Sequence, residues 1–164
     1  MRVFCDTSVL VAASLEEHLE HIRADRALDQ ICRGDDSGFA SVHTLAETFS
    51  VLSRMPTRPK LSPDEVLKML ERDIIPHFHF IRLDAKEYQG AIRDLVAKGS
   101  GGGRIYDMLH LKAASKLPLD RIYTFNDAEW KKLTPEMASL ICAPPAPAAA
   151  VPGRLPVAFW ALGH

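Results

Sequence analysis

The sequence repeats one unit, in which a short β-rich run ends at polar residues that favour the start of a helix. Three such runs are residues 2–5, 39–42 and 121–124, which lead into Asp6, Thr44 and Asn126-Asp127. Strands that alternate with helices favour a parallel sheet covered on both faces. The sequence therefore predicts an α/β fold, a three-layer α/β/α sandwich around a central, mainly parallel sheet.

Helix-capping patterns locate further elements. Ser62 with Glu65 predicts a helix to about Ile75, and Asp84 with Glu87 predicts another that ends before Gly99. Thr44-x-x-Glu47 has the same pattern and predicts a helix reaching about Arg54. The remaining expected elements are a strand over 78–83, a helix over 105–117 and an edge strand over 139–142.

A chain of 164 residues corresponds to about one domain. We place that domain at residues 1–142. From Ala143 on there are five prolines and, before the final residue, Arg154 is the only charge. Residues 143–164 are therefore expected to form an extended tail whose apolar end, 155–162, anchors on the domain, a second copy or a partner. A vector-derived or disordered extension is the alternative.

Charge and cysteine content exclude several classes of protein. Lysine and arginine number 20 against 21 acidic residues, so any nucleic-acid binding must rest on a local patch or on metal. Cys5, Cys32 and Cys142 form neither a disulfide framework nor a zinc motif, which favours the cytoplasm. No run of about 20 apolar residues predicts a membrane span.

Acidic and amide side chains follow the predicted strands, at the edge of a parallel sheet where function usually resides. They are Asp6, Glu47, Asp107 and the pair Asn126-Asp127. Each carboxylate could simply stabilise a helix start. A cluster would be different, because two carboxylates 4 Å apart repel by roughly 4 kcal/mol at an effective dielectric near 20. Oxygen ligands favour Mg²⁺ or Mn²⁺, and such ions support phosphoester hydrolysis.

Four segments carry a resemblance to a known family. They are Val3-Phe-Cys-Asp6-Thr-Ser-Val-Leu10, Leu45-Ala-Glu47-Thr-Phe-Ser-Val-Leu52, Ile105-Tyr-Asp107-Met-Leu-His-Leu111 and Tyr123-Thr-Phe-Asn-Asp-Ala-Glu-Trp130. In this order they resemble the signature segments of the PIN-domain ribonucleases, and most of all the VapC-type toxins of bacterial toxin–antitoxin modules. The similarity covers about residues 1–143.

The resemblance implies a Mg²⁺- or Mn²⁺-dependent endoribonuclease that cleaves RNA, has a cognate antitoxin and forms a homodimer. Asp6 and Asp107 would be the leading metal ligands, with Glu47 as a third carboxylate. Many relatives have an aspartate where this chain has Asn126, so Asp127 or Glu129 could fill the fourth position instead.

Two other readings remain to be compared. A PIN-like domain with an incomplete fourth position could be a catalytically weak module that binds RNA or protein. An aspartyl phosphatase needs a second aspartate where this chain has Ser8. His43, His77, His79 and His110 lack the spacing of metal ligands and are expected to be structural.

Overall fold

The structure is a computed structural model in which residues 1–146 are described. Five parallel strands form one sheet in the order β3-β2-β1-β4-β5. Their bounds are β1 (Arg2–Cys5), β2 (Ser37–Ser41), β3 (Phe78–Ile81), β4 (Arg121–Tyr123) and β5 (Ile141–Cys142). Because all five strands are parallel, their carboxyl ends lie at one edge of the sheet, as the sequence predicted.

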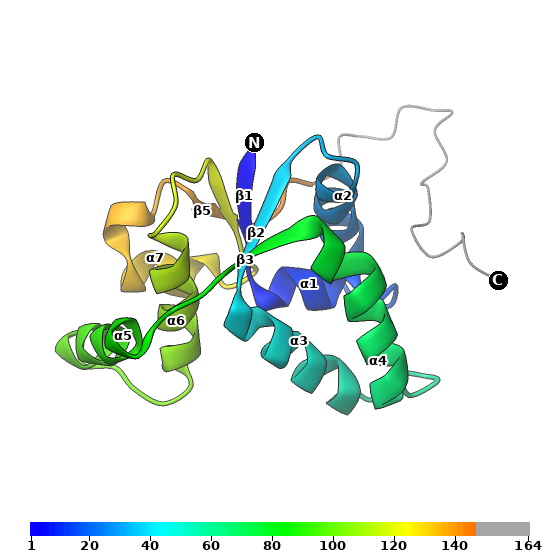
Figure 1. Cartoon of the computed structure of the whole chain (residues 1–164), viewed down its shortest axis with the longest axis horizontal. Coiled ribbons are helices and arrows are strands. Elements are labelled where there is room, and N and C mark those ends of the chain that lie inside the picture. The colour runs from blue at the N-terminus through cyan, green and yellow to red at the C-terminus, as the bar shows by residue number, and fades with distance from the viewer. Residues whose placement is uncertain (147–164) are drawn as a thin grey trace.

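Helices cover both faces of the sheet. They are α1 (Thr7–Ala13), α2 (His21–Cys32), α3 (Val42–Arg54), α4 (Pro63–Met69), α5 (Ala85–Ala97), α6 (Arg104–Ala114) and α7 (Asp127–Leu133), with short turns η1 (Leu70–Ile74), η2 (Ile75–His77) and η3 (Pro135–Met137). Figure 1 shows α1 to α4 on one side of the sheet and α5 to α7 on the other. The predicted three-layer α/β/α fold is confirmed.

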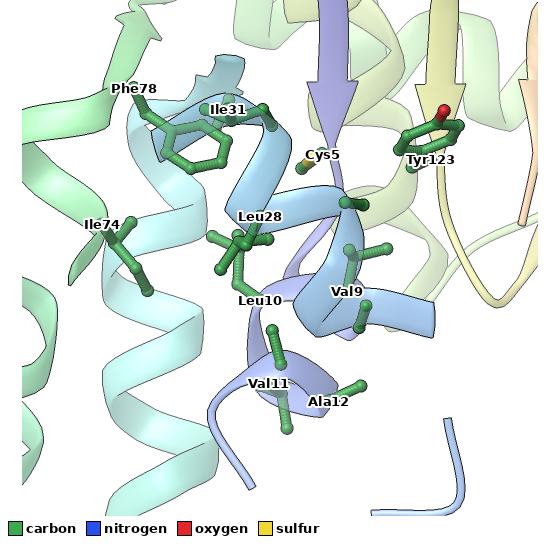
Figure 2. Packing of buried hydrophobic residues seen from close by; sticks show 14 of the residues in the cluster. Cys5, Val9, Leu10, Val11, Ala12, Leu28, Ile31, Ile74, Phe78 and Tyr123 are labelled. Carbon is green, nitrogen blue, oxygen red and sulfur yellow. The ribbon is translucent and has the colours of Figure 1, made fainter. Parts of the chain in front are cut away.

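Alternating side chains of the central strands supply the two cores. Cys5 and Tyr123 belong to the core formed with α1 and α2, and Figure 2 labels both in this core together with Leu10 and Leu28. Phe4, the neighbour of Cys5, is fully buried on the opposite face among residues of α6 and α7. The period of two along these strands therefore buries both faces of the sheet, as a parallel sheet requires.

Two predicted capping boxes are present. The Ser62 hydroxyl accepts a hydrogen bond from the Glu65 amide, and the Asp84 carboxylate accepts one from the Glu87 amide. In return, the side chain of each glutamate accepts a hydrogen bond from the backbone amide of the capping residue. The box predicted at Thr44 and Glu47 is wrong. Helix α3 begins at Val42, and Ser41 is its N-cap, accepting the Thr44 amide at 3.2 Å. The Glu47 side chain therefore does not cap the helix and contacts Thr7 and His110 instead.

Other boundaries differ from the sequence-based expectation. The helix from Pro63 ends at Met69 and continues as the π turn η1, and α6 ends at Ala114 rather than at residue 117. Helix α2 was not predicted. No helix within residues 1–146 is long and apolar enough to cross a membrane.

The chain is followed a few residues beyond β5. The Arg23 side chain on α2 donates from Nε to the Pro144 carbonyl at 2.9 Å. The predicted apolar end of the tail, 155–162, lies outside the described residues. The division into a domain and a tail therefore stays a prediction.

Candidate active site

Asp6 lies at the carboxyl end of the central strand β1. Its amide donates to the Tyr123 carbonyl at the end of β4, so the ends of these two strands are tied together. Its Oδ2 accepts the hydroxyls of Ser8 (2.7 Å) and Thr124 (2.8 Å), and the residue is only 6% exposed. Asp6 is the N-cap of α1 by position, but its side chain makes no capping bond. A simple capping role is therefore wrong for this carboxylate.

Glu47 lies on the second turn of α3, whose start is fixed by Ser41. Its Oε2 accepts the Thr7 hydroxyl at 2.7 Å and lies 2.6 Å from the His110 Nε2. Burial alone would raise the pKa of Glu47, but the hydrogen bonds and charge of His110, with the Thr7 hydrogen bond, outweigh it and lower that pKa. Glu47 is therefore held as a carboxylate.

Asp107 lies in the first turn of α6. Its Oδ1 accepts the indole N–H of Trp130, on α7, at 2.9 Å. Burial, together with the negative charges of Asp6 and Glu47, raises the pKa of Asp107 above its usual value, and the Trp130 hydrogen bond only partly opposes this. Burial is the main cause of the raised pKa, and the neighbouring acids add to it.

The fourth predicted position divides between neighbouring residues. Asn126 lines the same cavity as the three carboxylates. Asp127 does not: its Oδ2 accepts Lys131 Nζ at 2.7 Å along α7, and that ion pair lowers the pKa of Asp127. Glu129 is paired with Lys132 at 2.6 Å and with Arg104 at 2.8 Å. The structure thus brings Asn126, not Asp127 or Glu129, to the acidic cluster.

The three carboxylates and Asn126 line one open cavity of about 400 Å³. Its lining comprises Asp6, Thr7, Ser8, Val11, His18, Glu47, Val51, Asp107, His110, Phe125 and Asn126. A larger cavity of about 670 Å³ lies elsewhere, beside α5, α6 and α7, and one of its acids, Asp94, is paired with Lys112. The smaller cavity has the converging carboxylates, so it is the candidate site.

The donor set of this cavity suits a hard divalent cation. In each of Asp6, Glu47 and Asp107, one carboxylate oxygen is held by a protein donor, while the other accepts no hydrogen bond from residues 1–146. The second oxygen of Glu47 faces His43 Nε2 at 3.7 Å. Held ligands with a free oxygen are what a metal site needs. Within the described residues, however, no three His, Cys, Asp or Glu side chains are already gathered closely enough to hold an ion.

The sequence interpretation missed His110. This ring is 1% exposed and connects α6 to the start of α3, with its Nδ1 2.7 Å from the Ser41 hydroxyl and its Nε2 at Glu47. A lone histidine has no local pattern, and its partners lie more than 60 residues away in the chain. The usable signal was the spacing of Ser41, Thr44 and Glu47, which places three polar groups near one face of a strand-to-helix junction.

Comparisons with known proteins identify the family of the chain. The family model "PIN domain" matches residues 3–134. Ribonuclease VapC40 of Mycobacterium tuberculosis is 35% identical over 104 residues, which are 63% of this chain and 72% of that protein. Among solved structures, the Mycobacterium tuberculosis toxin VapC20, described as cleaving the sarcin-ricin loop, matches with a TM-score of 0.60 and 19% identity over 76% of this chain and 89% of that chain. FitAcB of Neisseria gonorrhoeae matches with a TM-score of 0.56 and 18% identity over 80% of this chain and 92% of that chain. The chain belongs to the PIN-domain family.

Proposed function

We propose that this protein is an endoribonuclease that uses Mg²⁺ or Mn²⁺ and serves as the toxin of a toxin–antitoxin module. The observation that carries the proposal is the convergence of Asp6, Glu47 and Asp107, from three separate elements, on one open cavity with Asn126 at its rim. The relatives support the same class, because one is named a ribonuclease and one is described as a toxin that cleaves the sarcin-ricin loop.

In this proposal the three carboxylates and the Asn126 amide oxygen hold the ion. When bound, a divalent cation supplies an activated water and offsets the charge that develops on a phosphodiester. The protein's own contribution is orientation. Ser8 and Thr124 hold one oxygen of Asp6, and Thr7 and His110 hold one oxygen of Glu47, so each carboxylate is oriented by one of its two oxygens.

The partners and setting follow from the same class. RNA is the substrate, a cognate antitoxin protein is the partner that restrains the enzyme, a homodimer is the assembly, and the cytoplasm is the location.

One observation favours a second candidate, a PIN-like module that binds RNA or protein and cleaves poorly. The fourth position of the cavity is the uncharged Asn126, while Asp127 is neutralised by Lys131. A site with three charges binds a divalent cation less tightly than a site with four. Such a module would bind RNA without cleaving it at physiological metal concentrations.

Cleavage of a mixed pool of RNA separates the two candidates. The nuclease proposal predicts cleavage with Mg²⁺ or Mn²⁺, no cleavage in excess chelator, and no cleavage by Asp6→Asn, whose amide keeps the size of the side chain and removes the charge. Glu129→Gln, at an acid outside the cavity, is the matched control and should cleave like the unmodified protein. Full cleavage by Asp6→Asn or in chelator would exclude the proposed chemistry, and RNA binding without cleavage would support the second candidate.

A further inference from the structure

Two buried aromatic rings lie directly behind the acidic cavity. His110 on α6 is 1% exposed and Trp130 on α7 is fully buried. Their rings are nearly parallel, with centroids 6.0 Å apart and planes at 17°. Each ring directs one N–H to a different carboxylate: His110 Nε2 lies 2.6 Å from Glu47, and Trp130 Nε1 lies 2.9 Å from Asp107.

The hydrogen bonds around His110 fix the position of its ring. The ionised Glu47 can only accept, so His110 Nε2 carries the proton toward it. On the other side of the ring, the Ser41 hydroxyl accepts the Thr44 amide and lies 2.7 Å from Nδ1. Both ring nitrogens therefore have partners, Glu47 at Nε2 and Ser41 at Nδ1, and the N-cap of α3 anchors the ring from behind.

Trp130 is anchored in a different way. Its indole N–H can only donate, and the ring is enclosed by the core between the sheet, α6 and α7. A fully buried indole has no room to follow a carboxylate that moves. Asp107 Oδ1 is therefore tied to a fixed point in the core, just as Glu47 Oε2 is tied to the start of α3 through His110 and Ser41.

We propose that the stacked His110–Trp130 pair positions Glu47 and Asp107 for metal binding, by fixing one oxygen of each carboxylate and leaving the other for the ion. This inference rests on the proposed function. The two rings are positioning residues and are not ligands. The stack fixes the two donors relative to each other, so the separation of the two carboxylates is set by core packing rather than by the open cavity.

A purely structural role would have a different signature. Buried polar atoms need partners whatever the site does. If the N–H groups of the two rings only satisfied that requirement, removing one would lower the melting temperature without changing the affinity for an ion in the protein that remains folded. Measuring metal affinity together with thermal stability therefore distinguishes rings that position the carboxylates from rings whose N–H groups only need a hydrogen-bond partner.

The test is calorimetric titration of Mn²⁺ into the full chain, with a thermal melt of each variant in chelator. Trp130→Phe keeps a six-membered aromatic ring and removes the N–H that binds Asp107. His110→Gln keeps an amide N–H at the same number of bonds from the backbone as Nε2, whereas His110→Met keeps bulk and loses the donor. Leu111→Val, in the same buried helix but away from the cavity, is the control for a weakened core.

We expect Trp130→Phe and His110→Met to weaken Mn²⁺ binding by about 10- to 100-fold, the usual effect of removing a group that orients a metal ligand. His110→Gln should retain most of the affinity, and Leu111→Val should melt earlier yet bind Mn²⁺ normally. Unchanged affinity in folded Trp130→Phe would overturn the inference, and this variant decides the question even if His110→Met fails to fold. If the unmodified chain binds no Mn²⁺, the proposed function fails first.

Discussion

Replacement of Glu47 separates its place in the cavity from its contribution to stability. Glu47→Ala removes the partner of the His110 Nε2, which is 1% exposed. The nearest alternative acceptor is Asp6 Oδ1 at 3.9 Å, too far for a hydrogen bond. A buried donor left without a partner costs about 1–3 kcal/mol. At roughly 2–4 °C per kcal/mol for a domain of this size, Glu47→Ala should melt about 2–12 °C earlier.

Glu47→Gln is the matched variant. Its amide oxygen has two lone pairs and can still accept from both His110 and Thr7, so it should keep most of the stability while losing the charge. Thermal melts in chelator and RNA cleavage with Mn²⁺ should be measured on both variants. We expect both to lose cleavage and only Glu47→Ala to lose marked stability. Equal melting temperatures for Glu47→Ala and the unmodified protein, or full cleavage by Glu47→Gln, would refute this reasoning.

Three further predictions concern charge, the fourth ligand and packing. The pKa of Asp107 is raised, first by burial and then by neighbouring acids, so its contribution to stability is present at acid pH and is lost as pH rises through that pKa. Asp107→Asn in chelator should therefore melt higher than the unmodified protein at neutral pH, with the difference vanishing in acid; a constant difference across pH would contradict this. Asn126→Ala should weaken Mn²⁺ binding and Asp127→Ala should not, because only Asn126 lines the cavity; calorimetry checks both. Gly38→Ala would place its Cβ 2.6 Å from Ile31 Cγ2 and 3.1 Å from the Phe78 ring, and should destabilise the fold by about 1–3 kcal/mol in chemical denaturation; no loss would show that this junction is loosely packed.

Local signals in the sequence were reliable where the structure is local. The capping residues Ser62 and Asp84 were recognised because each box closes within one helical turn. At Thr44 the same pattern misled, because Ser41, three residues earlier, takes the cap and leaves Glu47 to contacts 40 and 63 residues away. Tertiary contacts decided between two equally good local patterns.

Helix α2 was not predicted although its sequence carries a signal. It begins after Glu20, whose side chain makes no capping bond, so no cap marks its start. Its buried residues Ala24, Ala27, Leu28 and Ile31 nevertheless have the i, i+3, i+4, i+7 spacing of an amphipathic helix. What stabilises the helix is packing on α1 and the sheet, as Leu28 and Ile31 show in Figure 2.

The candidate site was predictable in part for the same reason. Asp6 and Asp107 could be assigned from strand ends and helix starts, and the parallel topology brings them together. The sequence could not show whether Asn126 or Asp127 lines the cavity. Asp127 is instead paired with Lys131, one turn further along α7. Residues that act through others, such as His110, become visible only once the helices are packed.

Diffraction from crystals grown with Mn²⁺ tests the central claim most directly, because the anomalous signal of manganese locates the ion without reference to activity. The account predicts a peak in the cavity that Asp6, Glu47, Asp107 and Asn126 line. A peak at another site, or none in this cavity at saturating Mn²⁺, would contradict the proposal that these carboxylates form a metal-dependent nuclease centre.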